Sequence, residues 1–273
     1  MSILNINGID VHYEVYGNET SRRIVFLLNS VMASTSSWYG LLECFEKLDM
    51  RVVLHDFMGQ LKSAKPAGPY TFDQHISHLL QLSDHLKVDS FHLLGTSYGS
   101  EVAMKCAIEH PQKVLSLTVI DGVSQVDEVM RAFLESWKKL CDNEDPYNFF
   151  WGMAPSIYGN DFIKKNQEFL EKRAISMRKV DRSYFEGQKI LYDTFLKEVN
   201  FTKRLHEIQC PTLIVVGEED ILKPVKFSRI IANNIDNSEF YVLPNCGHVT
   251  IFEKPEELKT LISGFYLKQR SDT

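Results

Sequence analysis

Residues 91–99 read Phe91-His92-Leu93-Leu94-Gly95-Thr96-Ser97-Tyr98-Gly99 and join an apolar run to a helical one. The run 91–94 predicts a buried strand, and 101–109 predicts a helix that ends before a proline. Glycines two positions before and after Ser97 allow the flanking backbones to approach closely. Such a turn places the Ser97 hydroxyl at the carboxyl end of a strand, beside the positive end of a helix dipole. Ser97 is therefore the candidate nucleophile, although the same residues can also form a purely structural turn.

Short apolar strands alternate with helical stretches on both sides of this turn. Strands are expected at 9–16, 24–28, 52–54, 115–120, 212–216 and 240–243. Helices are expected at 37–48, 71–86, 224–233 and 255–268, and Thr71 with Gln74 forms a capping box at the start of the second. This alternation predicts an α/β fold with a mostly parallel, doubly wound sheet flanked by helices.

The pattern changes between Gly122 and Leu205, where strand signals disappear. Amphipathic helical stretches are expected at 126–140, 161–177 and 182–197, and aromatic residues are concentrated in this part of the chain. We therefore divide the chain into a core (1–121 and 206–273) and a helical cap (122–205) that covers an apolar pocket. Individual cap aromatics either face a ligand or pack the cap against the core. The basic side chains are expected on solvated helix faces: Lys138, Lys139, Arg173 and Arg178.

The composition is that of an ordinary folded protein. The 273 residues are 44% hydrophobic and 24% charged, with a formal net charge of −6, which excludes a disordered chain. No cluster of Lys or Arg supplies the basic surface that nucleic acid requires, so no nucleic-acid partner is expected. Neither a signal peptide nor a membrane span is expected from the apolar runs. The five cysteines are scattered without CxxC spacing, which favours reduced thiols and a cytoplasmic location.

A serine nucleophile needs a base, and the base needs an acid to orient it. His248 follows the strand 240–243, so it is expected at the same sheet edge as Ser97. Asp220 follows the strand 212–216 and is the preferred acid, whereas Asp121, which directly ends the strand 115–120, is the alternative. The chain order serine, aspartate, histidine is the one expected of a nucleophile elbow.

Further motifs make the chain resemble α/β hydrolases of the small, helical-capped type, including esterases and enol-lactonases. They are Leu28-Asn29-Ser30-Val31-Met32 with Trp38, Asp56–Ser63, Gly217–Asp220 and Asn245–His248. The resemblance implies an eight-stranded sheet with the cap inserted after the sixth strand. It also implies an oxyanion hole made by the Val31 and Tyr98 amides. Asn29-Ser30 stands where most relatives have His-Gly. This Asn-Ser form is similar to the one in β-ketoadipate enol-lactonase-like members. Met58 and Leu61 replace the usual Arg and Gly of the second motif, for which only a structural consequence is expected.

The expected activity is hydrolysis of an ester-like bond, a carboxylic ester or a lactone, by a serine, histidine and aspartate acting together. The substrate is expected to be a small molecule with an apolar acyl group. Ser30, Met32, Trp151 and Val249 are expected to contact it. No cofactor and no metal are expected. The alternatives are a ligand-binding or signalling protein with little turnover, a thioesterase, a carbon–carbon hydrolase and an acyltransferase.

Overall fold

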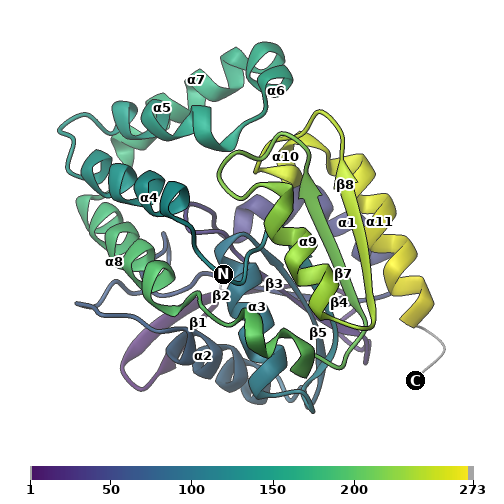
Figure 1. The fold of residues 1–273 in the computed structure, drawn as a ribbon. Coiled ribbons are helices and arrows are strands. Elements are labelled where there is room, and N and C mark those ends of the chain that lie inside the picture. Colours follow the sequence, from purple (N-terminus) through teal and green to yellow (C-terminus); the bar gives the residue numbers. More distant parts are fainter. Residues whose placement is uncertain (1, 270–273) are drawn as a thin grey trace.

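The computed structural model describes residues 2–269, and its centre is one eight-stranded sheet (Figure 1). The strand order is β1-β2-β4-β3-β5-β6-β7-β8. β1 pairs antiparallel with β2, and β2 pairs antiparallel with β4, whereas all the other neighbours are parallel. The strands are β1 (Ser2–Ile6), β2 (Ile9–Gly17), β3 (Ile24–Leu28), β4 (Arg51–His55), β5 (Phe91–Thr96), β6 (Val114–Ile120), β7 (Thr212–Gly217) and β8 (Ser238–Leu243). The predicted α/β class is confirmed.

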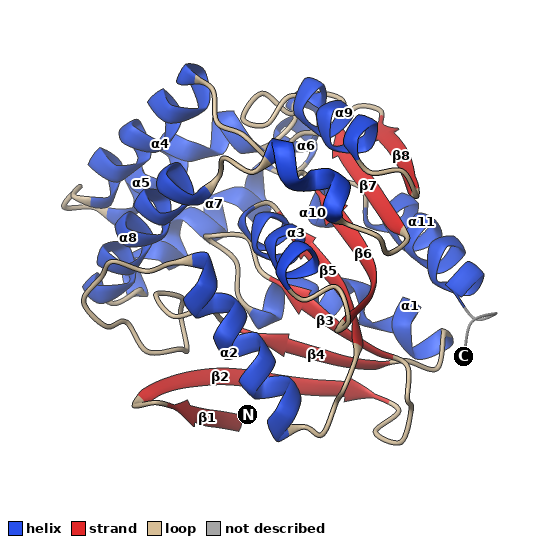
Figure 2. Cartoon of the chain, turned by 60° about the horizontal axis from the view of Figure 1, so that its bottom comes forward, coloured by secondary structure: helices blue, strands red, loops and turns tan. Residues whose placement is uncertain are grey.

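Helices cover both faces of the sheet, which is why its central strands are apolar along their whole length (Figure 2). Along β3, Phe26 and Leu28 pack into one core cluster together with residues of α2 and α3, whereas Val25 and Leu27 pack into another with residues of α1 and α11. The flanking helices are α1 (Leu42–Lys47), α2 (Phe72–His85), α3 (Tyr98–Glu109), α9 (Val225–Asn234), α10 (Thr250–Glu253) and α11 (Pro255–Lys268). The alternation of side chains along each strand therefore fills two cores at once.

Local sequence signals fix several helix boundaries. The Thr71–Gln74 capping box is present at the start of α2, as predicted. The helix expected at 37–48 is instead a 3-10 helix, η1 (Thr35–Leu41), followed by the short α1. α3 begins at Tyr98, three residues earlier than expected, because the helix starts directly at the turn that carries Ser97.

Five α-helices lie between β6 and β7, in the segment that we call the cap (residues 122–205). They are α4 (Glu128–Cys141), α5 (Pro146–Ile157), α6 (Asn160–Lys165), α7 (Gln167–Ser176) and α8 (Arg182–Glu198), with 3-10 helices η2 (Met177–Lys179) after α7 and η3 (Thr202–Glu207) after α8. The expected helix 161–177 is divided at Asn166, whose φ of −122° is not helical. α5 was not expected as a helix. Its first residue, Pro146, stands where a helix tolerates proline, and Pro155 lies inside it.

The described residues contain neither a membrane-spanning helix nor a disulfide. None of their helices is long and apolar enough to cross a membrane. All five cysteines are free thiols: Cys44, Cys106, Cys141, Cys210 and Cys246.

Candidate functional site

Ser97 occupies the turn between β5 and α3 in a conformation that few residues other than glycine adopt. Its φ is 51° and its ψ is −117°, and such strain concentrates at functional sites. A Cβ atom on Gly95 would collide with the Gly99 carbonyl, and one on Gly99 would collide with the Leu28 carbonyl. The two glycines therefore let the turn close against its own helix and against β3, as the motif predicts.

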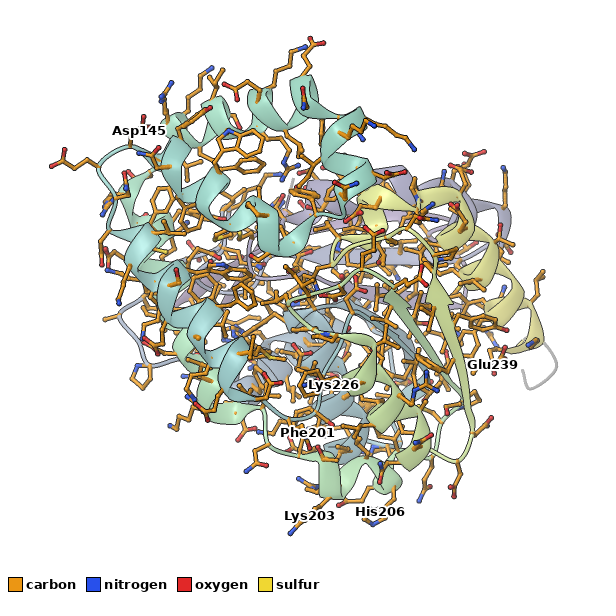
Figure 3. All side chains as sticks on the ribbon, turned by 45° about the horizontal axis from the view of Figure 1, so that its top comes forward. Asp145, Phe201, Lys203, His206, Lys226 and Glu239 are labelled. Carbon is orange, nitrogen blue, oxygen red and sulfur yellow. The ribbon has the colours of Figure 1, made fainter. Side chains whose placement is uncertain are left out.

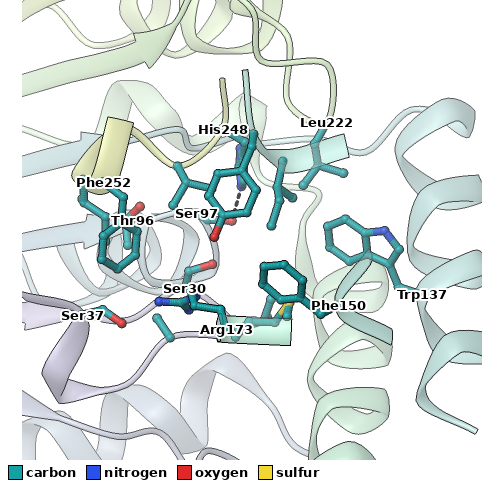
Figure 4. A pocket seen from close by; sticks show the side chains of 17 residues that line it. Ser30, Ser37, Thr96, Ser97, Trp137, Phe150, Arg173, Leu222, His248 and Phe252 are labelled. Atoms are coloured by element: carbon teal, nitrogen blue, oxygen red, sulfur yellow. Dashed lines mark hydrogen bonds between the residues drawn. The ribbon is translucent and has the colours of Figure 1, made fainter. Parts of the chain in front are cut away.

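His248 lies in the loop after β8 and contacts Ser97 directly (Figure 4). Its Nδ1 is 2.7 Å from Asp220 Oδ2, and its Nε2 is 2.9 Å from Ser97 Oγ. A carboxylate can only accept, so Nδ1 carries the proton and Nε2 accepts from the serine hydroxyl. The structure thus brings together Ser97, His248 and Asp220, which the sequence selected from the ends of three different strands.

Asp220 is held on both of its carboxylate oxygens. Oδ2 accepts from the His248 ring, and Oδ1 accepts from the Lys223 backbone N–H at 2.7 Å. The Lys223 side chain is itself buried and pairs with the fully buried Glu101 at 2.9 Å. Burial raises the pKa of Glu101, and the Lys223 charge opposes that shift. This buried pair fixes the segment that positions Asp220.

Asp121, the alternative acid, faces the neighbouring loops rather than the imidazole. Its carboxylate accepts from the Gly217 N–H at 3.2 Å and from the Thr250 hydroxyl at 2.9 Å. Burial, with the charge of Asp220 adding to it, raises the pKa of Asp121 well above its usual range. Asp121 therefore joins the loop after β7 to the helix that follows His248.

The loop after β3 and the start of α3 both border Ser97, and the Val31 side of that loop lines the same cavity. In the described part of the chain, neither the Val31 N–H nor the Tyr98 N–H has a hydrogen-bond acceptor. The Gln60 side-chain amide holds this loop, because it donates to the Ser30 carbonyl at 2.7 Å and to the Val31 carbonyl at 3.2 Å. Gln60 lies in the 56–63 motif, which was expected to have only a structural role. It is a positioning residue that sequence reasoning missed.

Asn29 stands where most relatives were expected to carry histidine, and it connects the same loop to the 56–63 motif. Its Nδ2 donates to the His55 carbonyl at 3.0 Å and to Gln60 at 3.0 Å, and its Oδ1 accepts from the Trp38 indole at 2.7 Å. A fully buried amide with these partners is well satisfied. Asn29 thus joins the loop after β3 to His55, Gln60 and Trp38.

A cavity of about 70 Å³ opens above Ser97 and His248, between the core and the cap. Three of the expected substrate contacts line it, namely Ser30, Met32 and Val249. The cap contributes Trp137 from α4, Phe150 and Ile157 from α5, Tyr158, and Arg173 from α7. The remaining lining residues are Val31, Ala33, Ser37, Thr96, Leu222, Ile251 and Phe252.

Two expectations about individual cap residues are wrong. Trp151 does not line the cavity, because its indole N–H donates to Glu171 at 3.3 Å and its ring packs among cap residues. Its neighbour Phe150 takes that place. Arg173 was expected on a solvated helix face, but it lines the cavity. One position along a helix turns a side chain by about 100°, which aromatic composition does not resolve.

The cap is hydrogen-bonded to the loop that carries His248. The His248 backbone N–H donates to the Ile157 carbonyl at 2.8 Å. The Glu253 carboxylate accepts from the Gly247 N–H at 2.9 Å and from the Gly159 N–H at 3.1 Å. Burial raises the pKa of Glu253, which these backbone donors oppose. The end of α5 and the His248 loop are therefore fixed to each other.

Comparison with known proteins identifies the family of this chain. A model of the alpha/beta hydrolase fold matches residues 23–255. The chain belongs to the α/β-hydrolase family. A proline iminopeptidase of Lactobacillus acidophilus is 25% identical over 92% of each chain. An α/β hydrolase from a Medee basin deep-sea metagenome library is 26% identical, with a TM-score of 0.92 over 97% of each chain. The enol-lactonase from Burkholderia xenovorans LB400 has a TM-score of 0.86 at 19% identity and covers 97% of this chain and 100% of its own.

The α/β-hydrolase family sets the reaction class as hydrolysis, whereas the names of these relatives differ in the bond that is cleaved. Within residues 2–269 of this α/β hydrolase, no group of three or more His, Cys, Asp or Glu side chains could hold a metal ion. The polar side chains at the cavity include the Ser97 hydroxyl, the His248 imidazole and the Arg173 guanidinium.

Proposed function

We propose that this α/β hydrolase cleaves a carboxylic ester or a lactone of a small molecule through an acyl-enzyme intermediate. One observation carries the proposal: Ser97, His248 and Asp220 form a continuous chain of hydrogen bonds at the floor of a mostly apolar cavity. Ser97 is 5% exposed, so its hydroxyl is largely shielded from bulk solvent. A small, largely apolar cavity suits a compact acyl or alcohol group, because each buried CH₂ contributes about 0.8 kcal/mol.

The proposed reaction has two steps. Ser97 Oγ attacks the carbonyl carbon while His248 Nε2 takes the hydroxyl proton, and Asp220 stabilises the imidazolium that forms. The Val31 and Tyr98 N–H groups donate to the oxyanion of the tetrahedral intermediate. The imidazolium then gives its proton to the departing alkoxide, which leaves the acyl group on the serine. Water deprotonated by His248 attacks this acyl-enzyme, releases the acid and restores the hydroxyl.

The lining of the cavity favours an ester or lactone over a peptide with a free amino end. An N-terminal ammonium group needs a carboxylate partner when it is desolvated. No Asp or Glu is among the described residues that line the cavity. Peptide cleavage, suggested by the name of one relative, is therefore the second candidate.

The test combines covalent labelling with turnover. A fluorophosphonate probe is expected to modify Ser97, and Ser97→Ala is expected to lower kcat for an accepted ester by about 10⁴-fold, because the nucleophile is removed. The matched control is Ser77→Ala, which alters an exposed serine on α2. Labelling at another residue contradicts the nucleophile assignment. Absence of both labelling and turnover across esters, lactones and proline amides favours a ligand-binding protein instead.

A further inference from the structure

Arg173 is the only arginine or lysine among the described residues that line the cavity above Ser97. It lies on α7 of the cap, is partly buried and reaches the same space as Ser30, Ser37 and Phe252 (Figure 4). The lining contains no carboxylate to neutralise its charge. A permanent positive charge therefore faces a cavity whose other walls are mostly apolar.

The guanidinium of Arg173 has no ion-pair partner among residues 2–269. The contacts of this group are with two aromatic rings, Phe169 at 5.7 Å and Phe252 at 5.4 Å from its central carbon. Rings stacked on the faces of a guanidinium leave the N–H groups at its edge free to donate. By contrast, Arg178 of the same cap donates twice to Asp145, at 2.9 and 2.7 Å, at the outer edge of the cap (Figure 3).

A second recess also borders Ser97 and has a different lining. It shares Val31, Ser97, Trp137 and Leu222 with the main cavity and is otherwise lined by apolar and aromatic side chains, with Lys223. The Lys223 charge is already neutralised by Glu101 at 2.9 Å. The two spaces that border the serine therefore differ: the recess is apolar apart from a paired lysine, whereas the main cavity carries a guanidinium without an ion-pair partner among the described residues.

We propose that Arg173 binds a carboxylate, so that the substrate is an ester with a carboxylate on either its acyl or its alcohol part. A guanidinium is weakly hydrated and matches a carboxylate with two parallel hydrogen bonds. The nearby Ser37 hydroxyl accepts from the Ser34 N–H at 3.2 Å, so its own proton is available to a second acceptor. The inference rests on the proposed ester hydrolysis and names its substrate class.

The experiment compares three esters of similar size. Phenyl butyrate is neutral, monophenyl glutarate has its carboxylate on the acyl part, and 4-butyryloxybenzoate has it on the alcohol part. Wild type is expected to prefer one of the charged esters to the neutral one. Arg173→Met is expected to lower kcat/KM for that ester by about 10- to 100-fold, mainly through KM, because a charge-assisted hydrogen bond is lost. The loss on phenyl butyrate should be clearly smaller, because this ester has no carboxylate to lose its partner.

Two further variants separate a binding role from a packing role. Lys172→Met removes an exposed cation from the same helix and should change none of the three rates. Arg173→Lys keeps the charge and should recover part of the preference for the charged ester. Equal losses on neutral and charged esters in Arg173→Met, or a wild type that prefers phenyl butyrate, would overturn the proposal.

A binding measurement distinguishes failure of this proposal from failure of ester hydrolysis. Glutarate and the neutral 1,5-pentanediol are titrated calorimetrically into wild type and Arg173→Met. Glutarate is expected to bind wild type but not Arg173→Met. The diol is expected to show no difference in affinity between the two proteins. If no ester is hydrolysed but this pattern holds, the anion site stands and the proposed reaction fails. If glutarate binds both proteins equally, the anion site fails whatever the esters show.

Discussion

His248 lies between a hydroxyl and a carboxylate, and each of its ring nitrogens has one partner. The Asp220 carboxylate selects the tautomer, and the Lys223 backbone N–H keeps that carboxylate from rotating. The Lys223 side chain is anchored in turn by Glu101, below the surface of the cavity. At the scale of single residues, the orientation of the proposed base thus depends on a chain of buried polar contacts that begins in α3.

Replacement of the acid tests this chain. Asp220→Asn is expected to lower kcat by about 10⁴-fold, because an amide favours the wrong imidazole tautomer. Asp121→Asn should cost far less activity, since Asp121 contacts Gly217 and Thr250 rather than His248. Steady-state kinetics of both variants on one ester, with folding checked by circular dichroism, give the comparison. The reverse ranking would assign the role of the acid to Asp121.

At the scale of elements, the two adjacent aromatics of α5 have different roles. Trp151→Ala is expected to lower the free energy of unfolding by about 1–3 kcal/mol, because a half-buried indole and its hydrogen bond to Glu171 are lost. KM should stay unchanged. Phe150→Ala removes a wall of the cavity and should raise KM for short apolar esters. Denaturant unfolding and Michaelis–Menten kinetics of both variants check this, and a larger KM effect at Trp151 would contradict it.

The sequence predicted those elements whose signals are local. The apolar run of β3 predicted a strand buried on both faces, and the capping box predicted the start of α2. Ser97 and His248 each follow a strand of a parallel sheet, so their positions at the same sheet edge could be predicted without distances. Gln60 was missed because its contacts with the 30–31 backbone join two loops far apart in the chain. The position of Arg173 depends on how α7 is rotated over the core, which no local pattern encodes.

At the scale of the whole molecule, buried carboxyl groups at the sheet edge make stability depend on pH. Because burial raises the pKa of Asp121 in the folded state, its contribution is fully present below its unfolded pKa of 3.8 and is lost as pH rises. Asp121→Asn removes this pH-dependent loss of stability, because an amide does not titrate. Relative to wild type, the variant should therefore gain stability as pH increases above about 4, by at most about 1.4 kcal/mol per pH unit.

A second carboxylate supplies a control of opposite sign. A hydrogen bond from Lys226 lowers the pKa of Asp127, so its stabilising contribution is present above the unfolded pKa and is lost as pH falls. Asp127→Asn should accordingly lose stability relative to wild type as pH rises. Urea unfolding at a series of pH values between 3 and 8 measures both differences. Parallel curves for wild type and Asp121→Asn would contradict a raised pKa of the buried Asp121.

The hydrogen bonds between the end of α5 and the His248 loop limit how the substrate specificity of this protein can be changed. The Ile157 carbonyl and the Gly159 N–H belong to the cap. The first accepts from the backbone N–H of the proposed base, and the second donates to the Glu253 carboxylate, which also accepts from the Gly247 N–H. A graft that replaces the whole cap exchanges the pocket wall and the support of the base in one step. Chimeras with relatives are therefore best joined so that residues 157–159 and Glu253 stay together, while α4 and α7 are the parts free to be exchanged.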